Sequence, residues 1–248
     1  MNKDEIKERT LSRNSIRNFI LRIDLIKNDK LNLKKIAEAA SQYFDRTEKR
    51  QINNFTINFT NSDSNLTKQE VFDFVLITES KSVSLTFSEF QNAFWIESSH
   101  YKNNSVYKDI LRNVIEIIKR CCSDIEAKRI GLRYINEFKC EKIKDMNCIY
   151  GKRLYSILKF MTSENNQSRI IGMEEYNNDG YKMRLQYGIP NKFYPAAITV
   201  CDLVLDIDSY KEYTCKVEEW EDIIAKLNHA AYDKFIKEIN AKYLEEIK

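Results

Sequence analysis

The sequence predicts an α+β fold: antiparallel sheets in two pseudo-repeated halves, each a meander of strands followed by a covering helix. Two patterns lead to this prediction. Runs of alternating apolar and polar residues, typical of half-buried strands, recur in both halves. Each group of strands is followed by a segment with apolar residues at helical spacing. With only 5 glycines and 2 prolines, no stretch resembles a linker. We therefore expect one domain over residues 1–248, with halves at about 17–140 and 145–248.

The first half begins with a charged segment, residues 1–16, for which we expect a loose arm or a short helix. Phe19–Ile26 is β-rich and alternates, which predicts a strand, and Leu33–Phe44 has helical spacing. Ser105 is a plausible N-cap for a helix that ends near Lys119-Arg120. Between these helices, alternation predicts strands over Gln51–Thr60, Val71–Thr78, Val83–Phe87 and Phe90–Glu97.

The stretch Arg129–Phe138 is expected to be the central strand. It contains Gly131, and it places a guanidinium, a phenol and an amide close together at Arg133, Tyr134 and Asn136. A glycine inside a strand often marks a close approach by another part of the chain. We therefore expect a helix or a loop to approach the strand at Gly131.

The second half is expected to repeat the plan after a short helix over Arg153–Met161. Asp179-Gly180 predicts a hairpin because these residues supply the positive φ angles of a type I′ turn. The strands and the long C-terminal helix are predicted over Ile170–Tyr176, Tyr181–Ile189, Ala197–Asp208 and Val217–Ile247. The apolar phase of the third strand flips near Cys201-Asp202, which suggests a bulge.

The composition limits the function classes. The net charge of +3 comes from 40 basic and 37 acidic residues, so nucleic acid is a possible partner but not a favoured one. The 6 cysteines form no CxxC and have only 2 histidines to join them, so we expect no Cys/His zinc site. We assign no metal-ligating residue and expect no cofactor. Met1–Asn18 lacks the apolar core of a signal peptide, and no apolar run approaches the ~18 residues of a membrane span. We expect a cytoplasmic protein with no membrane partner.

Arg133 is the first candidate for chemistry. A guanidinium on a central strand must be paired if it is buried. The structural interpretation is a salt bridge to Asp206 or Asp208. The alternative is an arginine in a pocket that presents its fork to a phosphate or carboxylate.

Asp206 and Asp208 form the second candidate. In a strand they face the same side, roughly 7 Å apart, and such a pair can hold a divalent metal. Asp202 would join them only if the strand keeps its phase. Acids that pair with Arg133 or face water are more common than metal ligands.

The remaining candidates are weaker. His229 lies between Leu227 and Ala231 on the last helix, so we expect it to face the sheet, more often as a hydrogen-bonding group than as a base. No serine or cysteine has a recognisable nucleophile setting and no phosphate-binding glycine loop is present, so the catalytic residues, if any, are unknown. The candidate ligand-binding residues are therefore Arg133, Tyr134, Asn136, Asp206, Asp208 and His229.

The stretches RIGLRYIN and LVLDID, with the later Leu227-x-His229 and Phe235, resemble an uncharacterised prokaryotic family of about this length that is sporadically distributed. The chain departs from the family in having Phe72–Phe74 where an indole is common. The resemblance implies no known reaction. The patchy distribution of the family implies accessory gene clusters, such as anti-phage defence or toxin–antitoxin loci.

The favoured function is a non-catalytic protein-binding component, a regulator, inhibitor or sensor, of a bacterial multi-gene system. An enzyme is less favoured because no nucleophile, metal or cofactor signature accompanies the well-patterned core. The alternative is a phosphate- or nucleotide-binding sensor, or a metal-dependent nuclease, that uses Arg133, Asn136, Asp206 and Asp208. It requires these side chains to converge on an open pocket instead of being buried and paired with one another. Homo-oligomerisation through the last helix is a third possibility, and the oligomeric state is left open.

Overall fold

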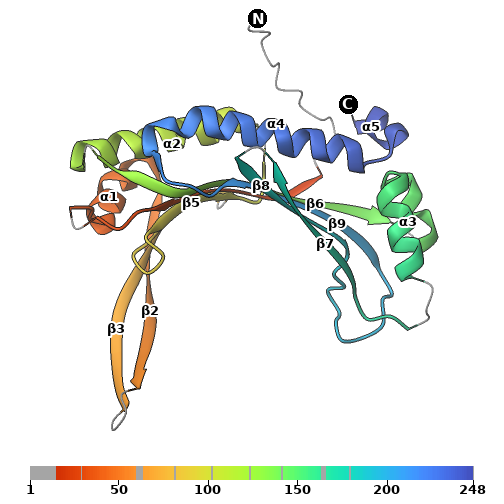
Figure 1. Ribbon diagram of the computed structural model, residues 1–248, viewed down its shortest axis with the longest axis horizontal. Coiled ribbons are helices and arrows are strands. Elements are labelled where there is room, and N and C mark those ends of the chain that lie inside the picture. Colours follow the sequence, from red (N-terminus) through yellow and green to blue (C-terminus); the bar gives the residue numbers. More distant parts are fainter. Residues whose placement is uncertain are drawn as a thin grey trace, which may run out of the picture.

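A computed structural model describes residues 15–28, 30–59, 64–80, 82–101, 103–122, 124–140, 142–162, 166–178 and 180–247. This part of the chain forms a 10-stranded antiparallel sheet with the order β2-β3-β4-β5-β1-β6-β9-β8-β7, and β10 pairs with β6. The sheet arches, with the helices α2 and α4 along its convex side and strands descending at both ends (Figure 1). The predicted α+β class, with a long helix near the C-terminus, is confirmed.

The elements before the central strand run in the order strand, helix, four strands, helix. They are β1 (Ile16–Leu25), α1 (Leu33–Ala40), the 3-10 helix η1 (Ser41–Tyr43), β2 (Arg46–Phe59), β3 (Ser64–Ile77), β4 (Val83–Ser88), β5 (Ala93–Ser98) and α2 (Asn104–Cys121). The strand β1 pairs with β5 on one side and with β6 on the other, antiparallel in both cases.

The later elements begin with the central strand. They are β6 (Glu126–Cys140), the 3-10 helix η2 (Ile143–Cys148), α3 (Lys152–Met161), β7 (Ile170–Asn178), β8 (Tyr181–Ile189), β9 (Cys201–Lys211), β10 (Cys215–Lys216), the 3-10 helix η3 (Val217–Glu219), α4 (Trp220–Glu238) and α5 (Ala241–Ile247). The predicted hairpin joins β7 to β8, and Gly180 there has a φ of 87°. Asp179 lies outside the described residues.

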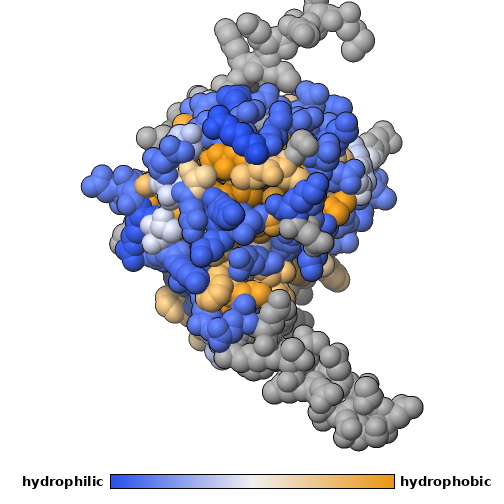
Figure 2. Space-filling view, turned by 90° about the vertical axis from the view of Figure 1, so that its left-hand side faces the viewer, coloured by the Kyte–Doolittle hydropathy of each residue, from blue (hydrophilic) through white to orange (hydrophobic). Residues whose placement is uncertain are grey.

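The core lies between the convex face of the sheet and the helices. Alternate residues of the two central strands are buried there, including Phe19 and Leu21 of β1 and Leu132 of β6. Apolar residues of α2 and α4, such as Leu111 and Ile224, belong to the same core. Because side chains alternate along a strand, the residues between these positions face the open concave side. At the end of the molecule that carries α1, the surface is mainly hydrophilic with a few separate apolar patches (Figure 2).

Two predictions for the C-terminal part are wrong. The last helix is not continuous, because α4 ends at Glu238 and α5 starts at Ala241. Between them Ile239 forms a β-bridge with Tyr150, and the backbone N–H of Asn240 donates to the carbonyl of Ile149. These contacts hold the backbone extended, so the helix stops.

The predicted bulge in β9 is also absent. The strand starts at Cys201, and its register with β6 is unbroken from Cys140 opposite Cys201 to Ile130 opposite Lys211. Asp202 therefore shares the concave face with the later aspartates of this strand.

At the N-terminal side, residues 1–14 of the predicted arm lie outside the described residues, and Ile16 already belongs to β1. The N-cap of α2 is Asn103, not Ser105. The Asn103 side chain accepts a hydrogen bond from the backbone N–H of Ser105, which places the predicted cap inside the first turn.

Candidate binding face of the sheet

The centre of the concave face carries arginines and aspartates from four adjacent strands. They alternate with the core residues of those strands, so the pleat directs them away from the helices. We call this set the arginine–aspartate network; its members are Arg22, Asp24, Arg129, Arg133, Arg184, Asp206 and Asp208.

Arg133 forms the shortest pair between strands in this network, with Asp206. Its Nε donates to both carboxylate oxygens at 2.9 and 3.2 Å, and its Nη2 donates to Oδ2 at 2.6 Å. These hydrogen bonds raise the pKa of Arg133. The side chain of Asp206 is 9% exposed, whereas that of Arg133 is 34% exposed. The predicted salt bridge is therefore present, with the carboxylate as its buried partner.

Asp208 lies between two other arginines. Its carboxylate is 3.3 Å from Nη2 of Arg129 and 3.2 Å from Nη2 of Arg184. Arg129 also approaches Asp24 at 3.7 Å, and Asp24 pairs with Arg22 at 2.6 Å. A chain of ion pairs thus crosses β1, β6, β9 and β8.

The pKa of Asp208 is raised. Burial raises it, and the nearby guanidinium groups of Arg129, Arg184 and Arg133 oppose this effect without cancelling it. In the network as a whole, the aspartate side chains are 7% to 9% exposed and the arginine side chains 22% to 39%, so the arginines are the members that reach the surface.

Gly131 makes room for part of this network. A Cβ at Gly131 would lie 3.1 Å from Cβ of Tyr210 and 3.3 Å from Cζ of Arg129. The missing side chain lets the Arg129 guanidinium cross the strand, where it also lies 4.6 Å from the centre of the Tyr210 ring. The expected helix or loop approach is not found: the neighbours that crowd Gly131 are side chains of its own sheet.

Aromatic and apolar side chains accompany the charges. The guanidinium of Arg22 lies 5.5 Å from the centre of the Trp95 ring. Ile20 lies opposite Arg133 in the register of β1 and β6, and it is partly exposed. Farther along the same face, Met173 of β7 is 61% exposed. The concave face therefore combines arginine, aromatic and apolar groups.

The candidate residues predicted from the sequence do not all meet on this face. Tyr134 and Asn136 lie on the convex side, 8% and 2% exposed. The hydroxyl of Tyr134 donates to Asn228 at 2.7 Å, and the amide of Asn136 donates to the carbonyl of Leu205 at 3.1 Å. Both are part of the packing between sheet and helices. Of the six candidates, only Arg133, Asp206 and Asp208 share the concave face.

The prediction that His229 faces the sheet is wrong. Its side chain is 61% exposed and lies 3.4 Å from Asp233. The neighbouring Leu227 and Ala231 occupy the buried positions of α4, which turns His229 outward.

Sequence reasoning missed Arg22, Asp24, Arg184 and Trp95. Arg22 and Asp24 interrupt an apolar strand, and Arg184 alternates with buried residues of β8. The sequence pattern therefore indicates that these three side chains face away from the core. What was missing was the strand order. Only the pairing of β1 with β5 and β6, and of β9 with β6 and β8, gathers these residues.

Over the described ranges of the chain, no three His, Cys, Asp or Glu side chains are grouped so that they could hold a metal ion. No helix in the same ranges is long and apolar enough to cross a membrane. Comparisons of the chain with protein-family models, with curated proteins and with solved structures find no match.

Proposed function

We propose that the chain is a cytoplasmic, non-catalytic binding component, a regulator, inhibitor or sensor, whose concave sheet face engages a protein partner. The observation that carries this proposal is the arginine–aspartate network. Each arginine bonds an aspartate against the sheet and keeps part of its guanidinium at the surface, with 22% to 39% of the side chain exposed. Such groups can donate hydrogen bonds to a partner's carbonyl and carboxylate oxygens.

The balance of charge on this face favours a protein over a polyanion. The arginines of the network face its aspartates, and Glu97 adds a further negative charge close enough to influence Arg133. A nucleic-acid interface needs a surplus of positive charge to displace counterions from phosphates. The rings of Trp95 and Tyr210 already lie beside guanidinium groups, so a stacking base would have to displace them.

The residue types on this face fit a protein interface. Arginine, tryptophan, tyrosine and methionine are the residues enriched at such interfaces and at their energetic centres. The aspartates hold the guanidinium groups in fixed orientations, so less side-chain entropy is lost when a partner binds. Arg133 and Arg22 each make a two-pronged bond of this kind, to Asp206 and to Asp24.

We further propose that the single domain consists of two pseudo-repeated halves. What supports this is the connectivity. In the first half β1 is followed by a helix and a meander whose last strand, β5, returns to pair with β1. In the second half β6 is followed by α3 and a meander whose last strand, β9, returns to pair with β6. A helix follows each meander, and the two first strands pair with each other at the centre.

The resemblance noted above adds the cellular setting of the proposal. A member of a sporadic prokaryotic family would act in a multi-gene system such as anti-phage defence or a toxin–antitoxin locus. Its protein partner would then be encoded nearby.

A pull-down of the tagged protein from its native host tests the proposal, with the eluate analysed by mass spectrometry and nucleic-acid staining. We expect a stoichiometric protein partner that is lost with Arg184→Gln or Met173→Ser. Lys226→Gln is the matched control, because Lys226 is exposed on α4 on the opposite side of the sheet. Stoichiometric nucleic acid without a protein would contradict the proposal, as would a substrate turnover abolished by Arg133→Ala in a folded protein.

A phosphate- or nucleotide-binding sensor is the second candidate, and one feature favours it. Arg133 bonds Asp206 through Nε and Nη2, which leaves Nη1 outside the pair for a phosphate oxygen. The metal-dependent nuclease version is less favoured, because a metal at Asp206 and Asp208 would have to displace their arginines. A nucleotide that co-elutes with the tagged protein in the same pull-down would support the sensor over the protein-binding component.

A further inference from the structure

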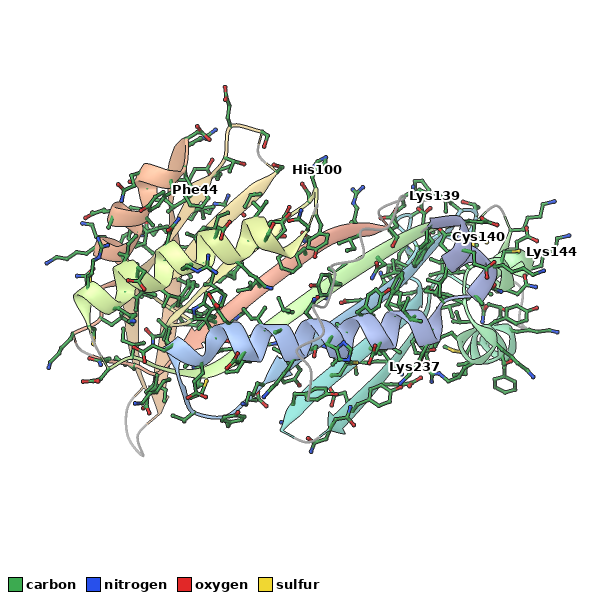
Figure 3. All side chains as sticks on the ribbon, turned by 90° about the horizontal axis from the view of Figure 1, so that it is seen from above. Phe44, His100, Lys139, Cys140, Lys144 and Lys237 are labelled. Atoms are coloured by element: carbon green, nitrogen blue, oxygen red, sulfur yellow. The ribbon has the colours of Figure 1, made fainter. Side chains whose placement is uncertain are left out.

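A cavity of about 680 Å³ lies away from the arginine–aspartate network, among η2, α3 and the segment that leads into β9. Its volume is within the range of small-molecule sites, roughly 300–1,000 Å³. Figure 3 shows Lys144, which lines the cavity, at the same end of the molecule as Lys139 and Cys140. No member of the arginine–aspartate network lines the cavity.

The lining of this cavity is positively charged. Lys144 comes from η2 and Lys159 from the last turn of α3, and both line the cavity. No aspartate or glutamate is among the described residues that line it, and neither lysine takes part in an ion pair with a described residue. Two lysines from different elements thus line one cavity, and no carboxylate of the described residues joins them there.

The rest of the lining divides into an apolar part and a polar part. Ile143, Met146 and Ile198 supply apolar surface that is continuous with the hydrophobic core. Tyr155 packs against that core with its ring and brings a hydroxyl, and Asn166 brings a side-chain amide. A ligand here would meet both apolar groups and hydrogen-bond donors.

We propose that this cavity binds a small amphipathic anion, an apolar body that carries one phosphate or carboxylate group. The anionic group lies between Lys144 and Lys159, where it neutralises both ammonium groups. The apolar body packs on Ile143, Ile198 and the ring of Tyr155. A neutral molecule of the same shape keeps the apolar contact and loses the charge interaction, so selectivity for the anion follows from the lysines.

Isothermal titration calorimetry on the full chain tests the proposal with three probes of one shape: 2-naphthyl phosphate, 2-naphthoate and 2-naphthol. We expect saturable binding of at least one anion, about tenfold or more tighter than 2-naphthol, and weaker at high salt. Whichever anion binds more tightly identifies the charged group as phosphate or carboxylate. The double variant Lys144→Gln/Lys159→Gln should weaken anion binding about tenfold or more and leave 2-naphthol unchanged.

Lys237→Gln is the matched control, since Lys237 is exposed on α4 and does not line the cavity. Ile198→Trp, which fills the cavity, should remove binding of all three probes, with the fold checked by circular dichroism. Three results would overturn the proposal: no saturable binding of either anion, equal binding of anion and naphthol, or an affinity that the double lysine variant leaves unchanged. None of them bears on the concave face, so the two proposals fail separately.

Discussion

The guanidinium of Arg129 lies over Gly131, two residues along the same strand, with its Cζ 3.3 Å from where a Cβ of Gly131 would be. From this position Arg129 reaches Asp208 at 3.3 Å and Asp24 at 3.7 Å. One glycine on the central strand therefore allows one arginine to join the ion pairs of β1 to those of β9.

Gly131→Ala should destabilise the protein by crowding Arg129 and Tyr210. A Cβ at 3.1–3.3 Å from its neighbours forces them to move by a few tenths of an ångström. We expect the free energy of unfolding to fall by about 1–2 kcal/mol, a typical cost of overpacking. Urea denaturation measures it.

A double-mutant cycle measures the part of that cost that comes from Arg129, as distinct from Tyr210. In an Arg129→Met background the flexible thioether can move aside, so Gly131→Ala should cost less than in the wild type. An equal cost in both backgrounds would show that Arg129 does not respond to the glycine.

The pair Arg133–Asp206 should respond unequally to removal of its two members. Arg133→Met leaves the 9% exposed carboxylate of Asp206 without its partner, and we expect a loss of about 2–4 kcal/mol in the free energy of unfolding. Asp206→Asn leaves an arginine that water can reach, so we expect a smaller loss, about 1–2 kcal/mol. Urea denaturation of both variants measures the difference.

Replacement of both members is the control for this pair. Because an apolar pair leaves no buried charge without a partner, Arg133→Met/Asp206→Leu should be more stable than Arg133→Met alone. If Asp206→Asn instead destabilises the protein more than Arg133→Met, the buried carboxylate is not the member of the pair that most needs its partner, and the prediction is wrong.

The position of most elements could be predicted from the sequence, because it depends on local pattern. Alternation located β1, β4 and β8, and Gly180 marked the hairpin between β7 and β8. The break after Glu238 could not be predicted, because its cause is distant: the β-bridge from Ile239 to Tyr150. The apolar stripe of α4 shows no irregularity there.

The site could be predicted only in part for a similar reason. The pairing of Arg133 with Asp206 or Asp208 could be predicted, since a buried guanidinium on a central strand needs a carboxylate partner. The contributions of Asp24 and Arg184 depend on strand order, which joins β1 to β6 and β9 to β8. His229 shows the opposite error: Leu227 and Ala231, two positions to either side, are buried, but the helical turn directs His229 outward.

Stability at acid pH should depend on Glu174. Burial raises the pKa of this carboxyl, but hydrogen bonds from Tyr176, Arg153 and Tyr187 outweigh it, and the pKa is lowered overall. A carboxyl with a lower pKa in the folded state stabilises the fold above its unfolded pKa, near 4.5, and this stabilisation is lost as the pH falls through the folded value.

Glu174→Gln removes this dependence. We expect the wild type to be more stable than the variant at neutral pH, and the difference to shrink as the pH falls below about 4.5. Urea denaturation at a series of pH values measures it. A difference that stays constant down to the lowest pH at which the protein folds would contradict the lowered pKa.

The start of α2 offers a test of its N-cap. The Asn103 side chain accepts hydrogen bonds from the backbone N–H of Ser105 at 3.2 Å and from its hydroxyl at 2.6 Å. Asn103→Ala leaves a backbone donor of the first turn without its acceptor, and we expect a loss of about 1 kcal/mol in the free energy of unfolding. Ser105→Ala keeps the cap and removes only the exposed hydroxyl, so it should cost less, within about 0.5 kcal/mol of the wild type. Thermal and urea denaturation of both variants give the order. If Ser105→Ala is the more damaging change, the helix is capped by the serine, as its sequence position first indicates.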